Sequence, residues 1–200
     1  MKSVRVILNP TAAGGRGAQL GPKIQDCLQS KAKDAKVELE WIVTEAPGHA
    51  LALSEEAAAD GRDMVVSIGG DGTTNEVVNG LMRAGTDSTR LGIIPAGSGN
   101  DFAWFAGVAL DPLAACRRLF DGETRVIDVG YIRDGNGRER YFNNGCGAGF
   151  DATVALEVEK FKWLRGILVY LVPLLKTVIF HHEIPTIRIS VDEREWTQSS

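Results

Sequence analysis

Short apolar runs alternate with amphipathic stretches up to about residue 120 of the chain. Runs of Val, Ile and Leu predict strands, and the longer segments between them predict helices. Alternation of this kind indicates a parallel sheet covered by helices on both faces. The expected strands are Val4–Leu8, Val37–Val43, Met64–Ile68 and Leu91–Ile94, and the expected helices lie near 19–31, 49–60, 73–83 and 112–120.

The pattern changes after about residue 121. Segments 124–132 and 139–150 flank a turn-rich RDGNG insert, which is typical of an antiparallel hairpin. Helical patterns follow to about residue 180, and the alternation in 186–196 predicts the start of another hairpin, with its turn at 192–194. The fold class expected is therefore α/β, with a parallel-sheet domain over 1–125 and the beginning of a β-rich second domain over 126–200.

The apolar segment 163–180 approaches the roughly 20 residues that a helix needs to span a bilayer. Arg165, Pro173 and Lys176 interrupt it, which favours a buried or interfacial helix over a spanning one. The spacing of its apolar residues predicts one helical face formed by Ile167, Tyr170, Leu171, Leu174, Leu175 and Val178.

Composition narrows the class of protein. The chain is 44% hydrophobic and 24% charged, which is typical of a soluble globular protein. A net charge of −4 without a long basic run argues against nucleic acid as a partner. The three widely spaced cysteines, Cys27, Cys116 and Cys146, predict buried or free thiols in a reducing cytosol rather than a disulfide or a zinc site.

Glycine-rich turns follow two of the expected strands. In GGDGTTNE, Gly69 and Gly70 allow a sharp turn and a close approach of a ligand. Thr73 is expected to cap the next helix, with Glu76 completing a capping box, so that the free N–H groups of the helix favour an anion. Taken alone, this stretch is equally consistent with a well-capped tight turn.

A second turn, PAGSGND, again supplies glycine, the hydroxyl of Ser98 and a carboxylate. If the strands before the two turns are neighbours, their ends lie about 5 Å apart, and Asp71 and Asp101 face one crevice. Phosphate, a divalent cation and a hydroxyl group would meet there. Asp101 alone could instead cap a helical turn over 102–105.

Other phosphate and hydrolase motifs are absent from the sequence. It contains no G-x-x-x-x-G-K-[ST] P-loop, no G-x-G-x-x-G after a strand and no G-x-S-x-G elbow. His49, His181 and His182 have no metal-ligand partners at useful spacing. His49 is expected at a helix start.

The two turns together, GGDGTTNEVVNG and PAGSGNDFA, resemble those of the diacylglycerol kinase catalytic-domain family, which includes bacterial lipid kinases and sphingosine kinases. NPTAAGGRG, VIDVG and YFNNGCGAGFDA resemble further elements of the same family. The resemblance implies a NAD kinase/diacylglycerol kinase-like fold. It also implies ATP-dependent transfer of a phosphoryl group to the hydroxyl of diacylglycerol or a related lipid.

Site residues follow from the resemblance, position by position. Asp71, Asp101 and Asp128 match family carboxylates at the active site, where acids hold Mg²⁺ beside the triphosphate. Asp128 could alternatively pair with Arg125 or Arg133. The residues implied to contact ATP are Asn9, Arg16, Thr44, Gly69, Gly70, Asp71, Gly72, Thr73, Thr74, Asn75 and Ser98.

The chain also departs from the family. The family's general base, in an Asp-Gly-Glu-like element, is expected beyond Ser200, and Asp192–Glu193 is not assigned to that role. The chain is therefore expected to be a fragment or inactive alone. The alternatives are a NAD kinase-like enzyme and a non-catalytic nucleotide- or lipid-binding module. The expected location is cytoplasmic, peripheral at the inner face of the membrane. The sequence leaves open whether the chain forms a homodimer.

Overall fold

The structure is a computed structural model that describes residues 2–147, 150–160, 168–180, 186–192 and 194–199. The chain forms two compact units, residues 1–144 and 145–200. The predicted domain boundary near residue 125 stays a prediction. His181, His182, Glu193 and residues 163–167 of the predicted apolar helix lie outside the described residues.

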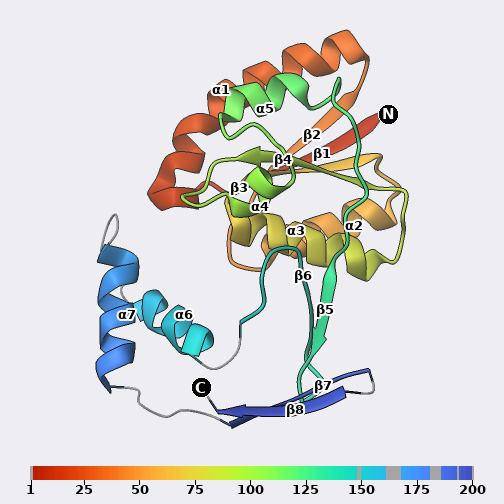
Figure 1. Ribbon diagram of the computed structural model, residues 1–200. Helices are drawn as coiled ribbons and strands as arrows, with labels where there is room; N and C mark the ends of the chain where they lie inside the picture. The colour runs from red at the N-terminus through yellow and green to blue at the C-terminus, as the bar shows by residue number, and fades with distance from the viewer. Residues whose placement is uncertain (1, 148–149, 161–167, 181–185, 193, 200) are drawn as a thin grey trace. The chain divides into compact units, whose positions relative to one another are not determined.

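A parallel sheet of four strands forms the centre of the first unit (Figure 1). The strands are β1 (Ser3–Leu8), β2 (Glu38–Val43), β3 (Met64–Gly69) and β4 (Arg90–Pro95), in the order β2-β1-β3-β4. Every neighbouring pair is parallel. The predicted α/β fold is confirmed, and so is the condition that the third and fourth strands are neighbours.

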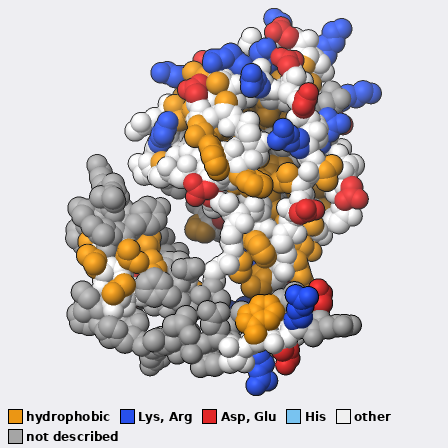
Figure 2. Space-filling view, viewed as in Figure 1, with side chains coloured by type: hydrophobic (Ala, Val, Ile, Leu, Met, Phe, Trp, Pro, Cys, Tyr) orange, Lys and Arg blue, Asp and Glu red, His pale blue; other side chains and the backbone are white. Residues whose placement is uncertain are grey.

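Helices cover both faces of this sheet (Figure 1). α1 (Ala12–Ala35) and α5 (Pro112–Arg118) pack on one face, and α2 (His49–Ala59) and α3 (Asp71–Ala84) pack on the other. Lys and Arg side chains gather on the visible surface where α1 lies (Figure 2), as expected for the solvated side of an amphipathic helix. Each face therefore has its own apolar layer.

The central strands explain the apolar runs in the sequence. All six residues of β3 are buried, and β1 is buried from Val4 onward, because both strands have helices above and below. Arg5 is the polar exception, with 3% of its surface exposed. Its guanidinium donates to Glu40 at 2.8 Å, to Glu56 at 2.7 Å and to the Leu53 carbonyl at 2.9 Å, so the buried charge is paired.

The rest of the first unit is less regular. After the short α4 (Asp101–Phe105), strands β5 (Gly130–Arg133) and β6 (Glu139–Phe142) form an antiparallel hairpin. The hairpin is shorter than predicted, because residues 124–129 have no partner strand. Asn79 of α3 holds the hairpin by donating to the Tyr141 carbonyl at 2.8 Å and accepting from the Tyr141 amide at 3.0 Å.

The second unit contains α6 (Phe150–Lys160), α7 (Leu168–Phe180) and an antiparallel pair, β7 (Thr186–Val191) with β8 (Arg194–Ser199). Lys176 of α7 donates to Glu157 of α6 at 2.6 Å. In the described part of the chain, no helix combines the length and the apolarity needed to cross a membrane. Three residues of the predicted apolar face, Leu174, Leu175 and Val178, are exposed.

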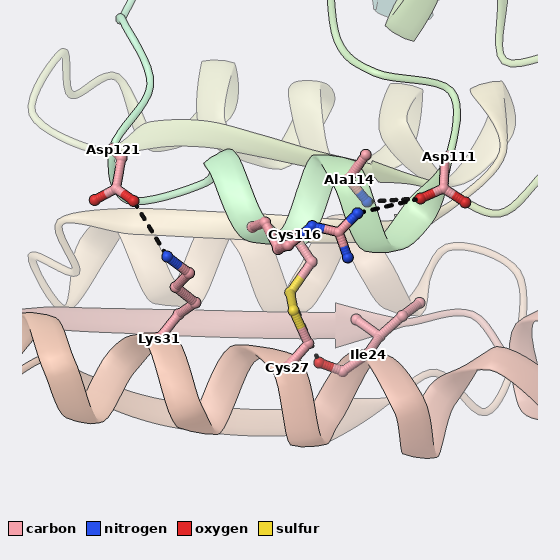
Figure 3. Close-up of a disulfide and its surroundings, with 8 residues drawn as sticks. Ile24, Cys27, Lys31, Asp111, Ala114, Cys116 and Asp121 are labelled. Carbon is pink, nitrogen blue, oxygen red and sulfur yellow. Dashed lines mark hydrogen bonds and ion pairs between the residues drawn. A yellow bond between two sulfur atoms is a disulfide. The ribbon is translucent and has the colours of Figure 1, made fainter.

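A disulfide joins α1 to α5 on their shared face of the sheet (Figure 3). It links Cys27 to Cys116, whose Cα atoms lie 6.6 Å apart, while Cys146 is free and exposed. The prediction of unpaired thiols is therefore wrong for this pair. The two cysteines are 89 positions apart in the sequence, and only the packing of the two helices brings them together.

Candidate nucleotide site

A pocket of approximately 410 Å³ opens at the carboxyl ends of the four parallel strands. Each strand contributes the residues that follow it, because the ends of parallel strands share one edge of the sheet. The lining includes Asn9 and Thr11 after β1, Thr44 to Pro47 after β2, Gly70, Gly72 and Thr73 after β3, and Gly97 and Ser98 after β4.

The β3 and β4 turns touch through their glycines. A Cβ atom on Gly97 would overlap the Cα of Gly70, and one on Gly70 would lie 3.0 Å from the Cα of Gly97. The amide of Ala96 donates to the Gly69 carbonyl at 2.7 Å, which continues the pairing of the strands into the turn. Glycine at these positions therefore lets two loops share one wall of the pocket.

Asp71 connects the same two turns. Its Oδ2 accepts the amide of Asn100 at 2.8 Å, and its Oδ1 accepts the amide of Phe102 at 3.0 Å. Asn100 has a φ of +63° and closes its own loop, because its side chain bonds both the amide and the carbonyl of Gly97. A half-buried carboxylate thus fixes the position of the PAGSGND loop and the start of α4.

The three predicted carboxylates do not share one environment. A Cβ on Gly99 would lie 3.1 Å from Asp71 Oδ2 and 3.6 Å from both carboxylate oxygens of Asp101, so these two acids lie close to the same glycine. Asp128 and Arg16 are exposed and do not line the pocket. Within the residues that the structure describes, no cluster of three or more His, Cys, Asp or Glu side chains is arranged to hold a metal ion.

Asn9 connects the β1 and β3 loops. Its Nδ2 donates to the hydroxyl of Thr73 at 2.9 Å, and its Oδ1 accepts the amide and the hydroxyl of Thr11 at 3.0 and 2.9 Å. Thr73 is therefore not the predicted N-cap: α3 begins at Asp71, and Gly70 precedes it. The predicted capping box is wrong because both of its members bond to other loops.

Glu76, which sequence reasoning assigned to that capping box, lines the pocket instead. Its Oε1 accepts the amide of Gly48 at 2.9 Å and its Oε2 accepts the amide of Ala50 at 3.2 Å. It therefore caps α2, which starts at His49 as predicted. The sequence hints at this role of Glu76 only indirectly: the residue before α2 is Gly48, which has no side chain to cap the helix and has a φ of +83°.

Two further residues of the predicted ATP set, Thr74 and Asn75, do not line the pocket and bond elsewhere. The side-chain Nδ2 of Asn75 donates to Asn143 Oδ1 at 2.8 Å and to the Tyr141 carbonyl at 3.2 Å, so Asn75 secures the β6 strand. The hydroxyl of Thr74 bonds that of Ser67 at 3.1 Å in the core. Asn9, Thr44, Gly70, Gly72, Thr73 and Ser98 do line the pocket.

The pocket fits a phosphorylated small molecule. Its volume lies in the usual range for ligand sites, roughly 300–1,000 Å³. Among the residues that the structure describes, no side chain caps α3 by a hydrogen bond, so its N-terminus, with Gly72 and Thr73 in the lining, offers backbone amides to an anion. Asp71 and Asp101 are not among the lining residues, but Asp71 stands between the lining residues Gly70 and Gly72, and both acids carry the carboxylate oxygens that Mg²⁺ prefers.

Known proteins are similar to this chain in sequence. The family model for the diacylglycerol kinase catalytic domain matches residues 3–132. The diacylglycerol kinase of Bacillus subtilis is 37% identical over 172 residues, which cover 85% of this chain and 54% of the relative. That of Mycobacterium tuberculosis is 36% identical over 173 residues, which cover 86% of this chain and 54% of the relative.

A solved structure extends the likeness to the fold. The crystal structure of a Bacillus anthracis protein assigned as a diacylglycerol kinase covers 98% of this chain and 61% of its own, with a TM-score of 0.72 and 26% identity. The chain spans about half the length of the curated relatives that it matches. The likeness includes the residues that line the pocket, all of which lie inside the matched family region.

Proposed function

Because the chain belongs to the diacylglycerol kinase catalytic domain family, we propose that it binds ATP and Mg²⁺ for phosphoryl transfer to the hydroxyl of diacylglycerol or a related lipid. The observation that carries the proposal is the pocket at the strand ends, where an uncapped helix N-terminus meets the Gly97–Ser98 loop. Phosphoryl transfer requires positioning and charge neutralisation more than covalent help, and in the proposal the pocket and the acids beside it would provide both.

In this proposal the nucleotide is oriented by the polar groups on one wall of the pocket and the apolar surface on another. Backbone amides at Gly72 and Thr73 and the hydroxyl of Ser98 would hold the phosphate oxygens. The wall after β2, which begins at Thr44, offers an apolar surface with Ala46 and Pro47 for the adenine ring. Arg16, although exposed, would add a positive charge on the phosphate side in this proposal.

Magnesium would be held at the turn where the acids gather. Asp71 already accepts two backbone amides, and an ionised carboxylate has about four acceptor positions, so oxygen lone pairs remain for a cation or its water. Asp101 lies close to Gly99, as Asp71 does, and would join it. In the proposal Asp128 completes the set. Bound Mg²⁺ would neutralise charge on the phosphates.

A lipid acceptor also requires a protein–membrane contact, and we include peripheral binding at the cytoplasmic face of a membrane in the proposal. The test gives the intact protein γ-labelled ATP and Mg²⁺ with diacylglycerol in mixed micelles, and runs parallel reactions with sphingosine and with NAD. Label in phosphatidic acid supports the proposal. Label only in the NAD reaction would overturn the lipid acceptor, and ATP binding without any transfer would favour a non-catalytic module.

A further inference from the structure

Two helices direct their N-termini at the same pocket. Ala50, the second residue of α2, and Gly72, the second residue of α3, both line it. The N-terminus of a helix carries unpaired amides and a partial positive charge, so each of these ends could attract phosphate. Two equivalent ends would let a nucleotide bind in two opposite directions.

Glu76 removes this equivalence. It lies on α3, yet its carboxylate accepts the amides of Gly48 and Ala50 at 2.9 and 3.2 Å and so occupies the N-terminus of α2. Its negative charge opposes the dipole of α2 at the place where an anion would otherwise bind. The first turn of α3 also carries an acid, Asp71, but its two carboxylate oxygens accept the amides of Asn100 and Phe102, and among the described residues no side chain caps the amides of α3 by a hydrogen bond.

We infer that Glu76 is a positioning residue that sets the direction in which the nucleotide lies: phosphates at the start of α3, sugar and base at the start of α2. The inference rests on the proposed function, because it assumes a nucleoside phosphate in the pocket. Glu76 excludes phosphate from the α2 end by charge and by occupying the amides. It also holds the wall that Ala46 and Pro47 form, since Gly48 follows them directly.

The substitution Glu76→Gln tests the inference with little change of shape. Glutamine has one acceptor oxygen, so at most one of the two α2 amides keeps a partner in full, and the charge opposing the dipole is lost. We expect ATP to bind about five-fold more weakly and inorganic pyrophosphate about three-fold more tightly in magnesium-free buffer, in line with the size of helix-dipole effects. Both affinities are measured by calorimetric titration of the full chain.

The expected changes in the affinities for ATP and for pyrophosphate have opposite signs, which distinguishes a loss of positioning from a loss of folding. A variant that is merely unstable would lose affinity for both ligands together. Glu55→Gln, the same change on α2 away from the pocket lining, is the matched control and should leave both affinities unchanged. Unchanged binding of both ligands in Glu76→Gln, or parallel loss of both, overturns the inference. Failure of the parent chain to bind ATP would instead count against the proposed function.

A second measurement uses the unaltered chain and so survives a variant that does not fold. If only the α3 end accepts an anion, adenosine and pyrophosphate occupy different parts of the pocket. Saturating pyrophosphate should then leave the affinity for adenosine within about two-fold of its value without pyrophosphate. Complete displacement of adenosine by pyrophosphate would show that phosphate enters the α2 end and would overturn the inference.

Discussion

Asp71 lies where the β3 and β4 loops meet, and both of its carboxylate oxygens accept loop amides, those of Asn100 and Phe102. The acid in a glycine-rich turn, which would repel phosphate if it faced the ligand alone, thus has a structural partner on the neighbouring loop. In the proposed function the same carboxylate also serves Mg²⁺. These two roles can be separated experimentally, because one affects stability and the other affects turnover.

For Asp71→Asn we expect turnover to fall by about 100-fold or more, because an amide supplies no charge to the cation that neutralises the phosphates. Only one amide acceptor oxygen remains for two backbone N–H groups, so the free energy of unfolding should fall by about 1–2 kcal/mol. Turnover is measured with labelled ATP, and stability by urea denaturation. Asp87→Asn, an exposed loop residue, is the control for both. A variant with near-normal turnover would leave Asp71 a purely structural residue.

At the scale of elements, the strands could be predicted well. Buried parallel strands such as β3 show as continuous apolar runs, and the glycines after them mark the turns. Pairings between distant residues could not be read in this way. Thr73 and Glu76 satisfy a local capping pattern in the sequence. In the structure, however, Thr73 bonds to Asn9, and Glu76 bonds to the start of α2. Local spacing carries no information about such partners.

The ion pairs of β1 with β2 and α2 predict a dependence of stability on pH. The hydrogen bond from Arg5 holds the pKa of Glu40 below its ordinary value of 4.5. A depressed pKa in the folded state means that Glu40 stabilises the fold above pH 4.5 and that this contribution is lost as pH falls through its folded pKa. The parent chain should therefore lose stability in acid at least partly through this group.

For Glu40→Gln we expect a loss of about 1–2 kcal/mol at pH 7, a value discounted because a third of the Glu40 side chain is exposed and Arg5 keeps Glu56. The difference from the parent should shrink as pH falls below 4.5. Urea denaturation from pH 7 to pH 3 measures both. Glu38→Gln, on the exposed end of the same strand, is the control. A difference that stays constant with pH would exclude this role for Glu40.

The bridge between α1 and α5 predicts a response to reductant. Closing a loop between cysteines 89 positions apart removes enough freedom from the unfolded chain to add about 4.6 kcal/mol of stability in the chain-entropy model. Reductant should therefore lower the denaturation midpoint of the parent and leave that of Cys27→Ser unmoved. Cys146→Ser should respond like the parent, because Cys146 is free. Three alkylated thiols in the denatured, unreduced parent would show that the bridge is absent.

At the scale of the whole molecule, the nucleotide pocket belongs to one unit. Every residue that lines it lies between positions 9 and 98, inside the unit 1–144, and the β5–β6 hairpin within that unit is bound to α3 through Asn75 and Asn79. In the proposed function, ATP binding is therefore assigned to the first unit alone. The family model, which ends at residue 132, likewise covers every residue of the pocket lining.

A shortened chain of residues 1–144 should accordingly bind ATP within about two-fold of the full chain, because it keeps the four strands, their helices and the hairpin contacts, including Asn143. Calorimetric titration compares the two chains. A chain that ends at residue 129 is the matched control: it lacks the hairpin, leaves the buried amide of Asn79 without the Tyr141 backbone, and should unfold at lower urea concentration. If residues 1–144 fold but do not bind ATP, the nucleotide site needs the second unit, and the assignment of binding to the first unit alone is wrong.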